Sequence, residues 1–248
     1  MVNSNMSKYS IITLEEVHST NSYALENVSF LEDKTIVFSP HQIEGRGRYK
    51  RKWICDDTEN IYMSFVLKPQ ENFFPYTNLT QYLSFIVCKY LENKFSLHPE
   101  IKWPNDILID GHKISGILAE TNMQNNQINA VILGLGLNVN LQQHTIDTID
   151  QKATSLAVLK NSYFDCEEIL RGICDMFFEK YDAFVKQGFS FIKEDYINRC
   201  GFLGKNITIR EAEVKKNYFA KKIDDYGLLI VDDEYGNECQ IITGDVLC

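Results

Sequence analysis

The sequence predicts an α+β fold, in which a mixed β-sheet is covered by helices and followed by a small C-terminal β-barrel. Apolar, β-prone runs are typical of buried strands, and they lie at 36–38, 60–67 and 129–140. Apolar residues at helical spacing over 79–95 indicate a helix packed against that sheet. After Gly201 the chain has only short strands separated by turns, as in small barrels. We therefore expect a main domain over 1–200 and a small β-barrel domain over 201–248.

The composition is that of an ordinary globular protein. Apolar residues make up 44% and charged residues 24% of the 248 residues, which suits one large domain and a small one. The net charge of −9 argues against general nucleic-acid binding, so a site for an anion must be a local patch. The seven cysteines include no C-x-x-C pair, which predicts reduced thiols in a cytosolic protein. No apolar run reaches the ~20 residues that span a membrane.

The first expected elements are a strand over 9–17, a helix, and a second strand over 34–39. Ser19, Thr20 and Asn21 are good N-cap residues, so the helix begins there. Their donors and acceptors also suit a neutral polar ligand, and ordinary helix capping is the alternative interpretation.

A basic loop follows the second strand. It runs from Gln42 to Trp53 and has five basic residues within 46–52. Gly45 and Gly47 disfavour a stable helix or strand, and repulsion between like charges predicts a mobile segment. Three interpretations are open at this point: a solvated surface loop, a nucleic-acid patch, or a lid for a phosphate or carboxylate, groups that arginine binds well.

The segment 101–120 predicts a β-hairpin. Asp110-Gly111 is a strong turn signal, because glycine accepts a positive φ without strain. The apolar flanks also carry groups that a core disfavours unless they are paired or belong to a site. These groups are Lys102, Asn105, Asp106 and Lys113. The hairpin therefore either presents a carboxylate and an ammonium to an anionic ligand, or is amphipathic with a solvated polar edge.

The strand over 129–140 contains Gly134 and Gly136, which lie two residues apart and so share one face. Because this face lacks side chains, it permits close approach by a ligand or another backbone. Tight packing in a curved sheet is the alternative.

Beyond this strand the sequence alternates between helical and extended patterns. A capping box of Asp165 and Glu168 opens a long helix that ends near Lys186. Shorter helices are expected over 153–160 and 189–200. The expected C-terminal strands lie at 207–209, 218–223, 228–231 and 240–242.

Together these motifs resemble the biotin–protein ligase family over nearly the whole chain. The sequence Lys-Trp-Pro-Asn-Asp stands at 102–106, and Lys113 with Gly-Ile-Leu follows it. The remaining matches are the Gly- and Arg-rich loop at 45–53 with Gln42 at its entry, the Gly-x-Gly-x-Asn strand at 134–138, and Ser-Thr-Asn at 19–21. The ordered set is far more specific than any one motif.

Two departures from the family pattern bear on function. Tyr49 and Lys50 stand where relatives often have another basic residue and a glycine, which puts the flexibility of the lid in question. The match begins near Tyr9 with no helix-turn-helix segment before it, so the chain resembles the monofunctional members and DNA binding is not implied.

The resemblance implies a class II synthetase-like catalytic domain with an SH3-like C-terminal barrel. Members of the family activate biotin with ATP, giving biotinoyl-5′-adenylate and pyrophosphate, and then transfer biotin to one lysine of a biotin carboxyl carrier protein. Mg²⁺ on the phosphates is implied by this chemistry, although no metal motif is visible. A cytoplasmic enzyme without nucleic-acid or membrane partners is expected, and a homodimer is left open.

The resemblance also implies the roles of particular residues. The catalytic candidates are Lys113, which would bridge carboxylate and phosphate, Arg48, which would add charge from the loop, and Asp106, which would orient or deprotonate the incoming lysine. The expected biotin-binding residues are Ser19, Thr20, Asn21, Gln42, Gly45, Arg46, Gly47, Arg48, Lys113, Gly116, Leu118 and Gly134. The expected ATP-binding residues are Trp53, Lys102, Asn105 and Asn138.

Strand geometry constrains this assignment. Strict alternation places Lys113 and Gly116 on opposite faces of their strand. Both reach one ligand only if a bulge lies between them, or if Gly116 contributes backbone alone.

Three other functions compete with this one. A lipoate–protein ligase shares the fold in outline, and competition by lipoate distinguishes it. A biotin- or nucleotide-binding regulator without turnover is disfavoured by the intact Lys113 and Asp106. A nucleic-acid-binding module is the weakest alternative, because an acidic chain carries only one basic patch.

Overall fold

The computed structural model of the chain describes residues 8–56, 58–68, 76–211 and 214–247. Its main element is a seven-stranded sheet with the order β1-β3-β5-β9-β8-β7-β6. β1 pairs parallel with β3 and the remaining neighbours pair antiparallel, so the sheet is mixed, as predicted. The strands are β1 Ser10–Thr13, β3 Thr35–Ser39, β5 Ile61–Leu67, β6 Pro99–Lys102, β7 Asp106–Ile109, β8 His112–Gln124 and β9 Gln127–Leu137.

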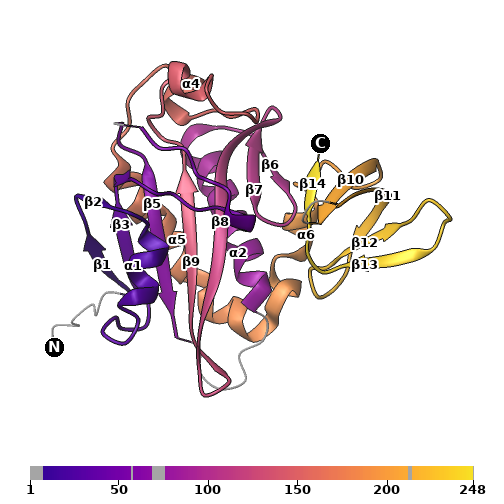
Figure 1. Cartoon of the computed structure of the whole chain (residues 1–248), viewed down its shortest axis with the longest axis horizontal. Coiled ribbons are helices and arrows are strands. Elements are labelled where there is room, and N and C mark those ends of the chain that lie inside the picture. The colour runs from indigo at the N-terminus through magenta and orange to yellow at the C-terminus, as the bar shows by residue number, and fades with distance from the viewer. Residues whose placement is uncertain (1–7, 57, 69–75, 212–213, 248) are drawn as a thin grey trace.

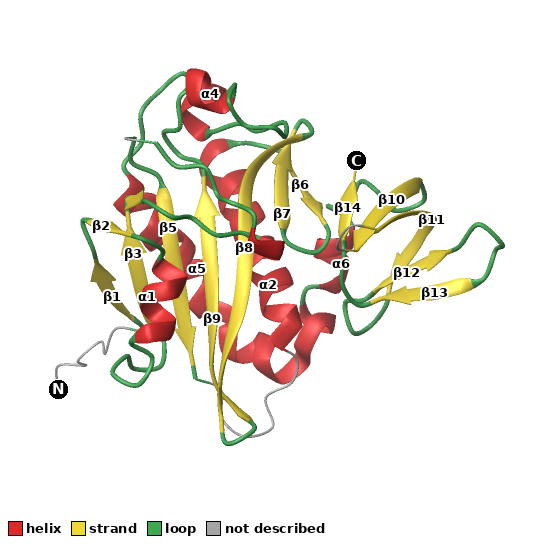
Figure 2. Ribbon diagram, in the orientation of Figure 1, coloured by secondary structure: helices red, strands yellow, loops and turns green. Residues whose placement is uncertain are grey.

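Both faces of the sheet are covered by helices (Figures 1 and 2). The helices α2 (Tyr76–Phe95) and α5 (Cys166–Gln187) lie behind the sheet, and α1 (Thr20–Glu26) lies in front. Alternate strand residues accordingly enter two clusters, with Phe65 on the α2 and α5 side and Val66 on the α1 side. Burial on both faces explains why these strands read as continuous apolar runs.

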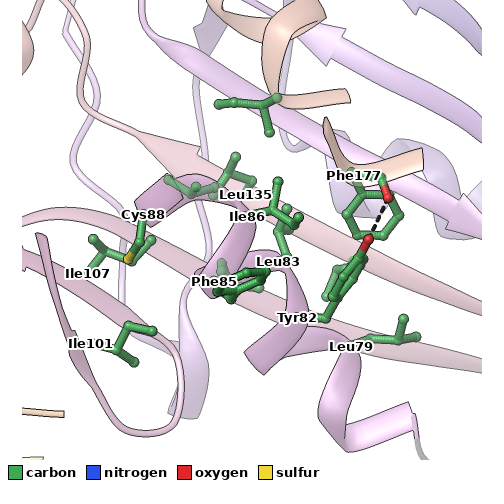
Figure 3. Close-up of a cluster of buried hydrophobic side chains, with 14 of the residues drawn as sticks. Leu79, Tyr82, Leu83, Phe85, Ile86, Cys88, Ile101, Ile107, Leu135 and Phe177 are labelled. Atoms are coloured by element: carbon green, nitrogen blue, oxygen red, sulfur yellow. Dashed lines mark hydrogen bonds between the residues drawn. The ribbon is translucent and has the colours of Figure 1, made fainter. Parts of the chain in front are cut away.

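Aromatic side chains pack in the core between the sheet and its two long helices, and Figure 3 shows Tyr82, Phe85 and Phe177 among aliphatic neighbours. The ring of Tyr82 stacks on that of Phe184 with 4.2 Å between the ring centres, and the ring centres of Phe65 and Phe177 lie 4.5 Å apart. The hydroxyl of Tyr82 donates to the carbonyl of Phe177 at 2.6 Å, so a fully buried polar atom is satisfied. These contacts hold α2 and α5 together behind the strands that carry the site.

The expected helices are present, with some changes at their ends. Asp165 caps α5 by accepting from the amides of Glu167 and Glu168. The Glu168 carboxylate pairs with Lys94 on α2, so only half of the predicted capping box is seen. The helix predicted over 189–200 is a 3₁₀ turn, η2 (Gly188–Phe191), followed by α6 (Lys193–Ile197). The other short helices are α3 Gln143–Ile146 and α4 Leu156–Lys160.

The strand predicted over 9–17 is divided in two. Its first part is β1, and its second part is β2 (Glu16–Val17), which pairs with β4 (His41–Gln42) in a separate small sheet. This pair sets the start of α1 beside the entry to the basic loop.

The C-terminal segment forms an open five-stranded antiparallel sheet with the order β13-β12-β11-β10-β14. Its strands are β10 Asn206–Glu211, β11 Val214–Ile223, β12 Leu229–Asp232, β13 Glu238–Ile241 and β14 Asp245–Leu247. In the part of the chain described, no pairing joins β13 to β14, so the closed barrel that we expected is not seen. The strand β14 is too short to give a sequence pattern of its own and was not predicted.

The two sheets are joined through a turn of the C-terminal segment. Gln81 and Asn78 on α2 donate to the carbonyls of Gly227 and Tyr226 at 2.7 and 2.9 Å. Trp103 donates to the same Gly227 carbonyl at 3.3 Å. Gly227 has a φ of +81°, and a Cβ there would lie 2.4 Å from Gln81, so glycine is needed for this approach. The C-terminal sheet is thereby fixed beside β6 and β7 (Figure 1).

Among the helices of the described ranges, none is long and apolar enough to cross a membrane.

Candidate active site

A cavity of about 680 Å³ lies where α1, β8, β9, the basic loop and the C-terminal sheet meet. Most of the predicted site residues line it: Ser19, Thr20, Asn21, Gln42, Arg46, Gly47, Arg48, Trp53, Asn105, Asp106, Lys113, Gly116, Leu118 and Gly134. Gly45, Lys102 and Asn138 lie outside the lining. The fold therefore gathers residues that are distant in sequence into one site.

The first wall is the polar start of α1. Ser19 is the N-cap, and the amide of Thr20 donates to Gln42 Oε1 at 2.9 Å. The side chain of Asn21 donates to the carbonyl of Leu118 at 3.2 Å. Ser64 Oγ lies 2.6 Å from Asn21 Oδ1 and 2.8 Å from Thr20 Oγ1. Capping and site formation thus occur together, because the residues that begin the helix also face the cavity.

Glycines of β8 and β9 form the floor. Gly116 and Gly136 stand directly opposite each other on the paired strands. A Cβ at either position would lie 2.7–2.8 Å from the indole of Trp53, so the ring rests on bare backbone. A Cβ at Gly134 would lie 2.2 Å from Asn21 Oδ1. The bare face predicted from sequence is present, and it admits the side chains of Trp53 and Asn21.

A buried ion-pair cluster forms the next wall. Asp106 lies 2.7 Å from Lys113 Nζ and 3.2 Å from Lys102 Nζ. Burial raises the pKa of Asp106, but the two ammonium groups, Lys113 above all, outweigh it and hold that pKa below its ordinary value. Lys113 Nζ also lies 5.2 Å from the centre of the Trp53 ring. A fixed positive charge therefore faces the cavity beside the glycine floor.

A β-bulge brings Lys113 to this face. Leu108 pairs with Lys113 and Ile107 with Ser115, so Ile114 is the extra residue of β8. Ile114 is fully buried in the core, and its carbonyl accepts from the amide of Asn138 at 2.9 Å.

Asn138 supports the site from outside the lining. Its side chain donates to the carbonyl of Thr154 at 3.0 Å, and its own carbonyl accepts from the amide of Leu156. Lys102 also lies outside the lining, and it pairs with Asp106, which lines the cavity.

The basic loop closes on itself over the cavity. The amide of Trp53 donates to the carbonyl of Gly45, and the amide of Gly47 to that of Arg51, both at 2.8 Å. Between them the 3₁₀ turn η1 (Arg48–Lys50) includes Tyr49 with a φ of +54°. The sequence predicted no stable helix or strand in this loop. It did not predict the backbone hydrogen bonds that close the loop on itself.

Carboxylates hold the arginine side chains of this loop. Arg46 Nη2 donates to Glu120 Oε2 at 2.9 Å, and the same oxygen accepts from Asn21. Arg48 Nη1 donates to Asp245 Oδ1 at 2.8 Å and lies 3.4 Å from Asn105 Oδ1. The arginines are thus directed along the rim of the cavity.

Several residues that line the cavity were not predicted from the sequence. The C-terminal sheet contributes Arg210 and Asp245, and the segment before α4 contributes Thr148, Ile149, Asp150 and Gln151. Tyr62 comes from β5, and burial raises the pKa of its hydroxyl, which keeps it neutral. Ser64, also in β5, lies outside the lining and contacts the side chains of Thr20 and Asn21 behind it. Buried Ser64 in an apolar strand was a usable signal, whereas no local pattern marks the others.

The arrangement suits a reaction between two anions. Lys113, Arg48 and Arg51 offer positive charge at one end. The start of α1, beside which Arg46 pairs with Glu120, offers neutral donors and acceptors at the other. In the described ranges no group of three or more His, Cys, Asp or Glu side chains could hold a metal ion.

Fold and site together define an α+β ligand-binding domain with a cationic rim and a glycine floor. The family model for the biotin/lipoate A/B protein ligase family matches residues 14–138, about half of the chain. The chain belongs to this family.

Individual relatives agree with the family match. A bifunctional ligase/repressor BirA from Bacillus spizizenii is 32% identical over 208 residues, covering 82% of this chain and 62% of the relative. A biotin–[acetyl-CoA-carboxylase] ligase from Paracoccus denitrificans is 28% identical, covering 91% of this chain and 95% of the relative. The match thus spans less than two thirds of the Bacillus protein and nearly all of the Paracoccus one.

A solved structure shares the whole architecture. Biotin protein ligase from Aquifex aeolicus, in complex with biotin and ATP, superposes with a TM-score of 0.81 at 27% identity. The superposition covers 96% of this chain and 97% of that one.

Proposed function

We propose that the protein is a biotin–protein ligase, which activates biotin with ATP to biotinoyl-5′-AMP and transfers biotin to a lysine of a biotin carboxyl carrier protein. The observation that carries this proposal is the ammonium of Lys113, which Asp106 holds at 2.7 Å beside a glycine floor. The printed names of the relatives, and the biotin and ATP of the Aquifex complex, support it.

The first step needs positive charge between two anions. A biotin carboxylate oxygen attacks the α-phosphorus of ATP, and the bond from that phosphorus to the bridging oxygen breaks to release pyrophosphate. Lys113 would lie between the carboxylate and the phosphate, and Arg48 and Arg46 would add fork-like contacts. Because Asp106 keeps the Lys113 ammonium in place, the charge is oriented before the substrates arrive.

We assign the two ends of the cavity to the two substrates. The donors and acceptors of Ser19, Thr20, Asn21 and Gln42 would bind the ureido ring of biotin. The bare backbone of Gly116 and Gly134, with Leu118, would border its tail, and the loop glycines 45 and 47 would let the lid approach. Trp53 and Asn105 would contact the nucleotide directly. Lys102 and Asn138 would act from behind the lining, through Asp106 and through the β8 bulge.

Asp106 would act in the second step, the transfer of biotin from the adenylate to the carrier lysine. The lowered pKa keeps its carboxylate ionised at neutral pH, so it would attract and orient the incoming lysine ammonium. Once the ammonium has lost a proton to water, the amine attacks the acyl carbon of the adenylate, and the bond from that carbon to the phosphate oxygen breaks so that AMP leaves. The carrier domain of a biotin-dependent carboxylase is the proposed partner.

Further parts of the proposal rest on the same resemblance. Mg²⁺ would enter with the ATP phosphates, since the described residues offer no metal cluster of their own. The open C-terminal sheet would belong to the SH3-like type, with the domain boundary near Gly201. A cytoplasmic location and a homodimer are also proposed, and sedimentation velocity tests the latter.

The deciding experiment is biotin-dependent exchange of pyrophosphate into ATP, followed by transfer to a carrier domain. We expect exchange with biotin, no competition from lipoate, and labelling of the carrier lysine. Preference for lipoate would identify a lipoate ligase instead. Tight biotin binding without exchange would identify a regulator without turnover.

A further inference from the structure

A fully buried asparagine directly before β5 binds three amides of the chain that leaves β9. The backbone ladder of these two strands ends at the pair of Ile61 and Leu137, so the amides that follow need another acceptor. Asn60 Oδ1 supplies it, since it lies 2.8, 3.0 and 3.1 Å from the amide nitrogens of residues 139, 140 and 141. Its Nδ2 donates to the carbonyl of Thr58 at 3.1 Å, which fixes the direction of the side-chain amide. One side chain thus sets the path of the chain at the end of β9.

Asn138, the residue before these three amides, connects them to the bulge of β8. Its backbone amide donates to the carbonyl of Ile114, the extra residue of the bulge, at 2.9 Å. Its side chain donates to the carbonyl of Thr154 at 3.0 Å, and the amide of Thr154 donates in turn to the carbonyl of Lys113 at 2.9 Å. Two routes of hydrogen bonds therefore join the segment that Asn60 holds to the backbone of residues 113 and 114.

The bulge decides where the ammonium of Lys113 points. Without the extra residue, alternation would direct this side chain away from the cavity. Asn60, Ile114, Asn138 and Thr154 are all buried, so water does not readily replace a hydrogen bond that is lost along these routes. A shift of about 1 Å at a reacting group can cost about 10²-fold in rate. The acceptor at Asn60 therefore matters for the site although it lies outside the cavity lining.

We infer that Asn60 is a positioning residue for the first reaction step, because it holds the Lys113 ammonium in place through Asn138 and the β8 bulge. The effect on catalysis rests on the proposed function. The link from Asn60 to the bulge belongs to the fold and can be measured without substrates.

Biotin-dependent pyrophosphate exchange distinguishes positioning from general stabilisation. Asn60→Ala should lower kcat about 10–100-fold and leave the KM for biotin within about threefold, because the loss falls on the placement of Lys113. Asn60→Asp, whose carboxylate can still accept the three amides, should keep kcat within about threefold of the parent. Asn140→Ala is the matched control, since Asn140 is also fully buried but its side chain bonds to the backbone of Glu59 and Phe164. Equal losses of kcat in Asn60→Ala and Asn140→Ala would overturn the inference.

A double-mutant cycle tests whether Asn60 acts through Lys113. In a Lys113→Ala background, Asn60→Ala should lower kcat by at most about threefold more, since the group that it positions is already absent. Asn60→Ser is a milder change for the same cycle, because its shorter side chain keeps one acceptor, and it should show the same dependence on Lys113. A loss that is undiminished in the Lys113→Ala background would make Asn60 a general stabiliser and overturn its positioning role.

Hydrogen exchange follows the link itself in the absence of substrates. Asn60→Ala should raise the hydrogen-exchange rates of the Asn138 and Thr154 amides about tenfold, whereas Asn140→Ala should leave them within about twofold. Parent-like rates at both amides in Asn60→Ala would overturn the link. A parent protein that binds no biotin and exchanges no pyrophosphate would overturn the proposed function and the catalytic role of Asn60, and the hydrogen-exchange rates would then decide the link alone.

Discussion

Lys113 and Gly116 lie on the same face of β8, although they are three residues apart. The bulge at Ile114 is the cause, and a Cβ at Gly116 would lie 3.1 Å from Lys113 Cε. Alternation without the bulge would direct the ammonium away from the cavity. A one-residue irregularity thus sets the position of the charge on which the proposed reaction depends.

The first prediction concerns Lys113. Lys113→Ala should lower the rate of biotin-dependent pyrophosphate exchange by about 10²–10³, because it removes positive charge where two anions meet. Lys152→Ala is the matched control, since Lys152 is exposed and lies outside the cavity. Exchange near the parent rate in Lys113→Ala would contradict the assignment.

The second prediction separates the two half-reactions. Asp106→Asn should impair transfer from preformed biotinoyl-adenylate more than it impairs adenylate synthesis, because an amide attracts the incoming ammonium less strongly. Single-turnover measurements of both steps decide the matter. Equal losses in both would move Asp106 to the nucleotide end of the site.

The third prediction concerns pH and stability. The pKa of Asp106 is lower in the folded protein than in the unfolded chain, where it is ~3.9. The ionised carboxylate therefore adds to the free energy of unfolding above pH ~3.9, and this contribution is lost as the pH falls through the folded pKa. Asp106→Asn should therefore destabilise the protein at pH 7 by about 3–5 kcal/mol, as expected for a buried charge cluster that loses one partner. The difference from the parent should shrink below pH ~4. Urea denaturation at several pH values measures the free energy of unfolding of both proteins. A difference between them that does not change with pH would exclude the ion-pair explanation.

The fourth prediction uses two neighbouring glycines as a matched pair. In Gly134→Ala the new methyl would displace Asn21, and in Gly136→Ala it would displace the indole of Trp53. Overpacking of this kind costs about 1–3 kcal/mol. Gly134→Ala should therefore raise mainly the KM for biotin, and Gly136→Ala mainly the KM for ATP. The opposite pattern would reverse the assignment of the two ends of the cavity.

The fifth prediction concerns proteolysis of the basic loop. In the free protein, trypsin should cut after Arg46, Arg48 or Arg51 faster as ionic strength rises, because salt screens their pairs with Glu120 and Asp245. Biotin with ATP should slow this cleavage more than biotin alone. Cleavage after Lys215, which is exposed on β11, provides the control. Loop cleavage that neither salt nor ligands change would indicate a permanently solvated loop.

Local patterns were enough to predict much of this fold. Periodicity located the strands and helices of the main sheet, and Asp110-Gly111 forms the predicted turn with positive φ at both residues. The spacing of Gly134 and Gly136 predicted a bare face. Alternation predicted a bulge between Lys113 and Gly116 if both side chains reach one ligand, with a backbone-only role for Gly116 as the alternative, and a bulge is present at Ile114.

Long-range contacts could not be predicted in this way. Arg48 and Asp245 are 197 positions apart, and nothing near Asp245 in the sequence distinguishes it from an ordinary surface acid. Repulsion between like charges led us to expect a mobile basic loop, and the carboxylates that pair with its arginines, Glu120 and Asp245, lie far away in sequence on β8 and β14. The short β14 and the open edge of the C-terminal sheet likewise depend on tertiary pairing, which periodicity does not report.

The indole of Trp53 also gives the molecule a built-in optical reporter. The chain has two tryptophans, and Trp103 is only 2% exposed and bonded to Gly227. Trp53 instead rests on the glycine floor with the Lys113 ammonium 5.2 Å from its ring centre. Any ligand that enters the cavity changes the surroundings of Trp53 far more than those of Trp103. Intrinsic fluorescence of Trp103→Phe therefore follows occupancy of the site through one ring, without an added dye.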